Sequence, residues 1–64
     1  MTKAQLFVLK EFPSAYYEPK TREVCLYSAG FVLGRGSVLA RSIENDAWRE
    51  AASQIKRRGW ATEA

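Results

Sequence analysis

Three consecutive cations, Lys56, Arg57 and Arg58, stand near the end of the stretch NDAWREAASQIKRRGW and are the side chains most able to bind an anion. Such side chains contact the phosphates of nucleic acids. Cations in the last turn of a helix also stabilise that helix through its dipole, by about 0.3–1 kcal/mol each. We expect the second role to dominate, because the earlier part of the same stretch carries acidic residues.

Nucleic-acid binding through this basic end is therefore the alternative function. The chain has a formal net charge of +3 and a pI near 9.4, a small excess that favours an anionic partner. Glu44 and Asp46 weigh against this function, because they make the start of the same helix negative. The contacts would come from the basic residues of the second half of the chain: Arg35, Arg41, Arg49, Lys56, Arg57 and Arg58.

Catalytic chemistry is poorly represented. The sequence has no histidine to act as a base, and its single cysteine, Cys25, lies inside a predicted strand. The carboxylates of Glu44, Asp46 and Glu50 lie on a polar helix face, which provides no pocket to shift their pKa values. One cysteine with scattered carboxylates also gives no ligand set for a soft metal. We predict that the protein is not an enzyme and has no cofactor and no metal site.

The coarse pattern predicts one α+β domain of 64 residues, in the order β-β-β-α, with the sheet over about 4–41 and the helix over about 42–58. The apolar residues of QLFVLKEF, residues 5–12, favour a first strand. The prolines of residues 13–21 indicate a loop. REVCLYS and FVLG then form an antiparallel hairpin around Ala29-Gly30.

A helix from about Ser42 has suitable residues at both ends. Ser42 is a good N-cap and Gly59 a natural residue to follow the last turn. An apolar stripe would cover the sheet: Ile43, Ala47, Trp48, Ala51, Ala52 and Ile55. GRGS lacks the pattern of a phosphate-binding loop and indicates a turn or bulge. Residues 37–41 stay open between strand, loop and a helix that begins at Ser37.

Aromatic and apolar residues of the first half are the candidate partner surface. A strand over residues 5–12 would bury both faces, leaving Phe7 and Leu9 for a second copy or another protein. Tyr16 and Tyr17 are adjacent, so one ring would point outward from an extended segment. Trp60, outside this surface, would fold back onto the last turn of the helix and pack as a satellite of the core rather than as an interface anchor. We predict a protein-interaction module that binds a protein partner or itself.

The segment from Phe31 to Arg57, with GRGS and EAASQI, resembles the C-terminal half of double-stranded-RNA-binding domains. That resemblance implies a sheet and an alanine-rich helix whose start meets phosphates through a lysine cluster. Here the helix starts with SIEND, and we expect the first helix of that family to be missing. LGRGS followed by AWREAA resembles small uncharacterised phage and prophage proteins, which implies an accessory protein of no known activity.

The remaining expectations concern location. The longest apolar run is interrupted by charges and is shorter than the roughly 20 residues that a membrane span needs. The first residues lack the apolar region and cleavage site of a signal peptide. A single cysteine suggests a reducing compartment. We expect a cytoplasmic protein with no membrane contact.

Overall fold

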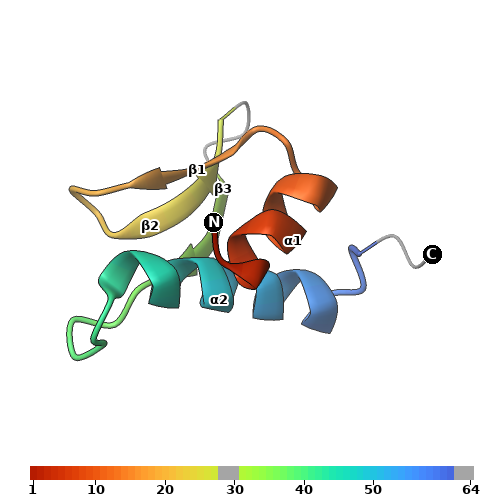
Figure 1. Ribbon diagram of the computed structural model, residues 1–64. Helices are drawn as coiled ribbons and strands as arrows, with labels where there is room; N and C mark the ends of the chain where they lie inside the picture. Colours follow the sequence, from red (N-terminus) through yellow and green to blue (C-terminus); the bar gives the residue numbers. More distant parts are fainter. Residues whose placement is uncertain (28–30, 62–64) are drawn as a thin grey trace.

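A computed structural model describes residues 1–27 and 31–61 (Figure 1). The elements follow the order α1 (Lys3–Glu11), β1 (Ala15–Glu18), β2 (Glu23–Leu26), β3 (Phe31–Arg35) and α2 (Ile43–Arg57). The three strands form one antiparallel sheet in the order β1-β2-β3, and α2 packs on it, chiefly against β3. The prediction of an α+β fold with a three-stranded antiparallel sheet and a C-terminal helix is confirmed.

The predicted strand over residues 5–12 is wrong, because this segment is helix α1. The Thr2 hydroxyl accepts the Gln5 N–H at 3.2 Å, so the helix has a proper N-cap. Its other end is fixed by the Phe12 N–H, which donates to the Val8 carbonyl at 2.7 Å, and by Pro13, which cannot continue the helix. The chain therefore does have a helix before its sheet, contrary to the expectation from the RNA-binding resemblance.

Helix α1 packs against α2 (Figure 1). The apolar residues of this segment therefore serve helix packing and not the two faces of a strand. Val8 is fully buried between the helices and the sheet, while Leu6 points away from the core and is exposed. Phe7 and Leu9, predicted to lie on a free strand face, are half-buried and pack against the core. Phe7 and Leu9 therefore need no second copy to cover them.

Strand β1 lies where a loop was predicted, between Pro13 and Pro19. The two prolines stand outside the four paired residues, so neither removes a hydrogen bond from the ladder. β1 pairs antiparallel with β2, with Tyr16 opposite Cys25 and Tyr17 opposite Val24. The sheet therefore has three strands although the first was expected in the wrong place.

The predicted hairpin of β2 and β3 is confirmed, while its expected turn at residues 29–30 lies outside the described residues. Val24 pairs with Gly34 but Cys25 pairs with Val32, so β3 carries one extra residue, the buried Leu33. A Cβ on Gly34 would lie 2.8 Å from the Ala47 carbonyl oxygen. The first glycine of GRGS therefore permits close packing of β3 on α2.

Helix α2 begins where the sequence predicted. The Ser42 hydroxyl accepts the Asn45 N–H at 3.4 Å, as expected for an N-cap. Residues 37–41 form a loop, so neither the strand nor the early-helix alternative holds. Asp46 fastens this loop to α2, because its carboxylate accepts the Ser37 N–H at 2.6 Å.

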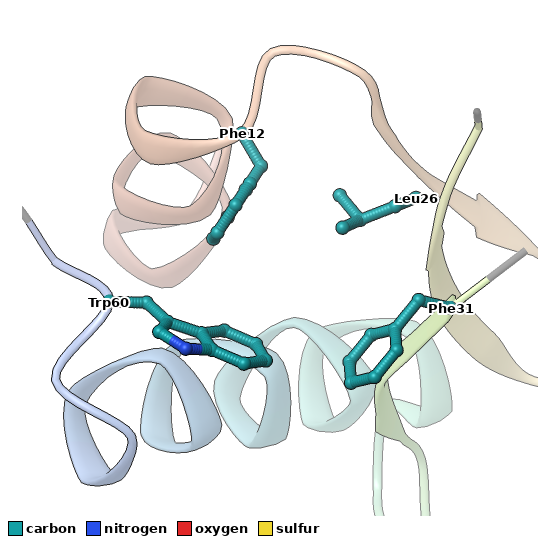
Figure 2. Close-up of a pocket in the computed structure, with 4 residues that line it drawn as sticks. All are labelled: Phe12, Leu26, Phe31 and Trp60. Carbon is teal, nitrogen blue, oxygen red and sulfur yellow. The ribbon is translucent and has the colours of Figure 1, made fainter. Parts of the chain in front are cut away.

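The other end of α2 is a Schellman motif. The Gly59 N–H donates to the Lys56 carbonyl at 3.2 Å, and the Trp60 N–H donates to the Ile55 carbonyl at 3.0 Å. Gly59 has a φ of +68°, the left-handed conformation that this motif requires. The motif turns the chain so that Trp60 lies beside α1 and β3 (Figure 2). The predicted role of Gly59 is confirmed. Trp60 does fold back, but its ring lies against Phe12 and Phe31.

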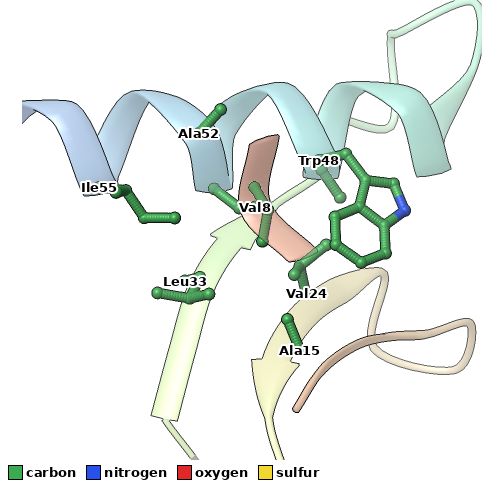
Figure 3. Packing of buried hydrophobic residues seen from close by; sticks show 9 residues of the cluster. Val8, Ala15, Val24, Leu33, Trp48, Ala52 and Ile55 are labelled. Atoms are coloured by element: carbon green, nitrogen blue, oxygen red, sulfur yellow. The ribbon is translucent and has the colours of Figure 1, made fainter. Parts of the chain in front are cut away.

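The core lies between α2, α1 and one face of the sheet (Figure 3). Trp48 is only 2% exposed, as predicted for the residue that joins the helix to the sheet. The small side chains of Ala47 and Ala51 let α2 approach the sheet, and both are fully buried. The predicted stripe is confirmed, except that Ile43 at its start is only half-buried. Within the described residues, no helix is long and apolar enough to cross a membrane.

Candidate functional site

An open apolar hollow lies where the ends of several elements meet (Figure 2). Its volume is about 510 Å³, and we call it the aromatic hollow. Phe12 comes from the end of α1, Leu26 from β2, Phe31 from β3, and Trp60 from the turn after α2. The four side chains converge on one space because the Schellman motif brings Trp60 back toward the other three.

The rings of the aromatic hollow are ordered by edge-to-face contacts but are not buried. The Trp60 ring lies 6.1 Å from the Phe12 ring and 5.6 Å from the Phe31 ring, both in T-shaped geometry. Phe31 is 38% exposed and Trp60 is 39% exposed. Two large aromatic side chains therefore keep a substantial contact area in water.

Arg58 supplies positive charge at the edge of the aromatic hollow. Its guanidinium carbon lies 5.1 Å from the centre of the Trp60 ring and 5.8 Å from that of Phe31, which is cation–π distance. The Arg58 Nε–H also donates to the Gln54 side-chain oxygen at 3.3 Å. These contacts hold the guanidinium beside the rings, where it can meet a carboxylate of a ligand.

A second depression, of about 470 Å³, runs between α1 and α2, and we call it the helix groove. The part of the chain that the structure describes contributes no acidic residue to this groove. The Lys56 Nζ lies 5.1 Å from the centre of the Phe7 ring. The lining residues are Lys3, Ala4, Phe7, Arg49, Ala52, Ser53 and Lys56.

The structure divides the three consecutive cations at the end of α2. Lys56 lines the helix groove, whereas Arg58 lies over the rings of the aromatic hollow. Arg57 is exposed and lines neither depression. Lys56 and Arg58 therefore have contacts of their own in addition to the position near the helix dipole that the sequence predicted.

Two of the acidic residues that weighed against anion binding, Glu44 and Asp46, accept hydrogen bonds from other groups of the chain. The Trp48 indole N–H donates to the Glu44 carboxylate at 3.4 Å, so Glu44 supports the core residue. Asp46 holds the loop before α2 through Ser37. Glu50 follows Arg49 by one position, about 100° further around the helix. None of the three carboxylates lines the groove.

The tyrosines predicted as a partner surface have separate environments. Tyr16 is exposed, and its ring makes a T-shaped contact with Tyr27 at 5.6 Å. Tyr17 is half-buried and packs against the core. The prediction that one of the two rings faces outward is confirmed. Neither tyrosine, nor Leu9, belongs to the aromatic hollow or the helix groove.

Two predicted basic contacts also lie elsewhere. Arg35 ends β3 and Arg41 lies in the loop before α2, and both are exposed. Neither lines the helix groove. Of the six basic residues proposed for nucleic acid, the structure brings Arg49 and Lys56 together in one groove. Lys3, which was not among the six, lines the same groove.

Cys25 is an unreactive type of thiol. Its side chain is 8% exposed and lies outside the main core cluster, between Tyr16 and Val32 on neighbouring strands. Burial raises the pKa of the Cys25 thiol, and the nearby Glu23 and Glu18 carboxylates raise the pKa further. The thiolate, which is the nucleophile, therefore forms only at higher pH than in a free cysteine.

The residues of the aromatic hollow were missed because sequence spacing does not bring them together. Phe12 was assigned to a strand, and Phe31 and Leu26 were expected only as hairpin residues. The signal that could have helped was Thr2 followed by helix-forming residues and then Pro13, which indicates a helix ending at Phe12. That assignment would also have placed Lys3 and Phe7 on a helix next to α2.

Comparison with known proteins does not assign the chain to a family. The chain matches no protein-family model, no curated protein sequence and no solved structure.

Proposed function

We propose that this protein is a non-enzymatic protein-interaction module whose aromatic hollow receives an apolar side chain from an acidic segment of a partner. The observation that carries the proposal is the set of half-exposed, mutually ordered rings of Phe31 and Trp60 with Arg58 held over them. Trp and Arg are the residue types that contribute most binding energy at protein interfaces.

The apolar part of the interaction follows from the lining of the hollow. A Phe or Leu side chain of the partner would contact Phe12, Leu26 and the two exposed rings, removing their apolar surface from water. The T-shaped contacts favour this arrangement of the rings before binding, which lowers the side-chain entropy lost on association. This preorganisation favours a defined side chain in the hollow over non-specific adhesion.

The charge of the partner follows from the rim. Arg58 lies over the rings of Phe31 and Trp60, so the positive charge at this rim comes from its guanidinium. A carboxylate next to the inserted side chain would pair with Arg58, while a lysine there would be repelled. Complementary charge of this kind raises specificity and the rate of association. An acidic segment with one large apolar residue therefore fits this surface best.

Synthetic peptides test the proposal directly. The first probe has a central phenylalanine flanked by glutamates, the second has the same phenylalanine flanked by lysines, and the third replaces the phenylalanine of the first with alanine. Binding is followed by NMR of the backbone amides. We expect the acidic phenylalanine peptide to bind roughly tenfold or more tightly than either other peptide, the effect of about 1.4 kcal/mol. The shifts should centre on Phe12, Phe31 and Trp60.

Variants locate the binding energy. Trp60→Ala should weaken the acidic phenylalanine peptide by about 2 kcal/mol, roughly 30-fold, as for an interface hot spot. Tyr16→Ala is the matched control, because it removes an exposed ring on the sheet outside the hollow. Melting curves check that both variants stay folded. Equal affinity for all three peptides, or binding unchanged by Trp60→Ala, would contradict the proposal.

A further inference from the structure

We infer that the helix groove is a second binding site, which takes the phosphates of a nucleic-acid backbone. Three cations line it from two helices, Lys3 of α1 and Arg49 and Lys56 of α2. The Ser53 hydroxyl adds a hydrogen-bond donor between the two basic positions of α2. Arg, Lys and Ser are donors that proteins use toward phosphate oxygens.

The spacing along α2 places these donors on one side. Arg49, Ser53 and Lys56 follow one another by four and three positions, the intervals that keep helical residues on one face. The described lining offers no carboxylate, so every polar side chain that lines the groove can donate a hydrogen bond to an anion. Glu44 and Asp46, which make the start of α2 acidic, bond to Trp48 and Ser37 instead.

Lys56 contacts an aromatic ring of the groove. Its Nζ lies over the Phe7 ring at 5.1 Å, and Phe7 is half-buried between the two helices. This cation–π contact favours the observed position of the ammonium group, and Lys56 remains exposed. The groove thus combines a fixed apolar floor with exposed cations, the reverse of the aromatic hollow. A flexible chain of phosphates fits an elongated row of donors better than a single compact anion does.

The test is a salt titration with a labelled duplex RNA, a duplex DNA and a single-stranded RNA, with inorganic pyrophosphate as competitor. Binding that neutralises three duplex phosphates has a log–log salt slope of about −2.7. Lys56→Gln and Arg49→Gln should each make the slope shallower by about 0.9. Lys56→Arg should restore it, because the charge returns.

The control variant is Arg57→Gln. Arg57 neighbours Lys56 in the same exposed turn but does not line the groove, so its loss should leave the slope unchanged. If Arg57→Gln makes the salt slope shallower by as much as Lys56→Gln does, the inference is overturned, because binding would then be diffuse attraction to the helix end. No duplex or single-strand binding at low salt would also overturn it. Displacement by pyrophosphate at matched phosphate concentration would assign the groove to a free anion instead.

Discussion

The aromatic hollow and the helix groove lie beside the same last turns of α2, yet they combine the same kinds of residue in opposite ways. In the hollow, rings line the space and a cation lies over them; in the groove, cations line the space and a ring lies beneath Lys56. Successive helical residues are turned by about 100°, so Lys56 and Arg58 point to nearly opposite sides. Adjacent charges in a sequence can therefore belong to different sites.

Both depressions depend on the position of α2, and removing its main contact with the sheet should abolish both. Trp48→Ala should cost about 3–5 kcal/mol. The whole free energy of unfolding of a chain this size is roughly 3–10 kcal/mol. We expect loss of the cooperative thermal transition in circular dichroism, with Trp48→Phe keeping most of it. A Trp48→Ala melt within a few degrees of wild type would show that this contact does not hold the two surfaces.

Two glycine variants should have different effects, because Gly34 supports the packing that both depressions share, whereas Gly59 positions only the aromatic hollow. Gly34→Ala places a methyl group against the backbone of Ala47 and Ala51, and we expect about 1–3 kcal/mol of destabilisation. Gly59→Ala meets no atom within 4 Å but must keep a φ of +68°, which costs about 1–2 kcal/mol.

Urea denaturation measures the change in the free energy of unfolding for each glycine variant. Peptide binding then shows which variant disturbs the aromatic hollow. Gly59→Ala loosens the motif that positions Trp60, so peptide affinity should fall while the duplex salt slope stays the same. Gly34→Ala should weaken both kinds of binding in proportion to the fraction unfolded. A stable Gly34→Ala protein would mean that β3 and α2 are not in close contact.

The part of the fold that the sequence predicted is the part governed by local signals. Helix α2 is defined by its N-cap Ser42, its stripe of Ala and Ile residues, and Gly59 after its last turn. Each of these signals depends only on residues within or next to this one helix. The strand prediction for residues 5–12 was wrong because the apolar residues of this segment are close together and fit either a strand or a helix. The Thr2 cap, 3.2 Å from the Gln5 N–H, and the stop at Pro13 were the decisive signals.

The two sites could be predicted less well because each depends on tertiary contacts. The hollow requires Phe12, Leu26, Phe31 and Trp60 to converge from four segments. The groove requires α1 to lie against α2. Because residues 5–12 were predicted as a strand, the sequence did not indicate a groove between two helices. Arg49 and Lys56 were selected as cations, but the sequence did not separate them from Arg57.

The smallest expected effect concerns the sheet face that lies outside both depressions. Because burial raises the pKa of Cys25, its alkylation by iodoacetamide should be slower than that of a free cysteine. The rate should increase until pH passes the raised pKa. Neither the acidic peptide nor the duplex should protect Cys25, which lines neither site. Protection by either ligand would place its binding surface on the sheet.

The most direct measurement compares both ligands on three single variants of the last turn, Lys56→Gln, Arg57→Gln and Arg58→Gln. Each variant removes one charge, so all three lose a similar helix-dipole contribution of about 0.3–1 kcal/mol. We predict that Lys56→Gln impairs only duplex binding, Arg58→Gln impairs mainly peptide binding, and Arg57→Gln impairs neither. If all three variants weaken both ligands equally, the cations act only as a common positive end of α2, and the account of two separate sites is contradicted.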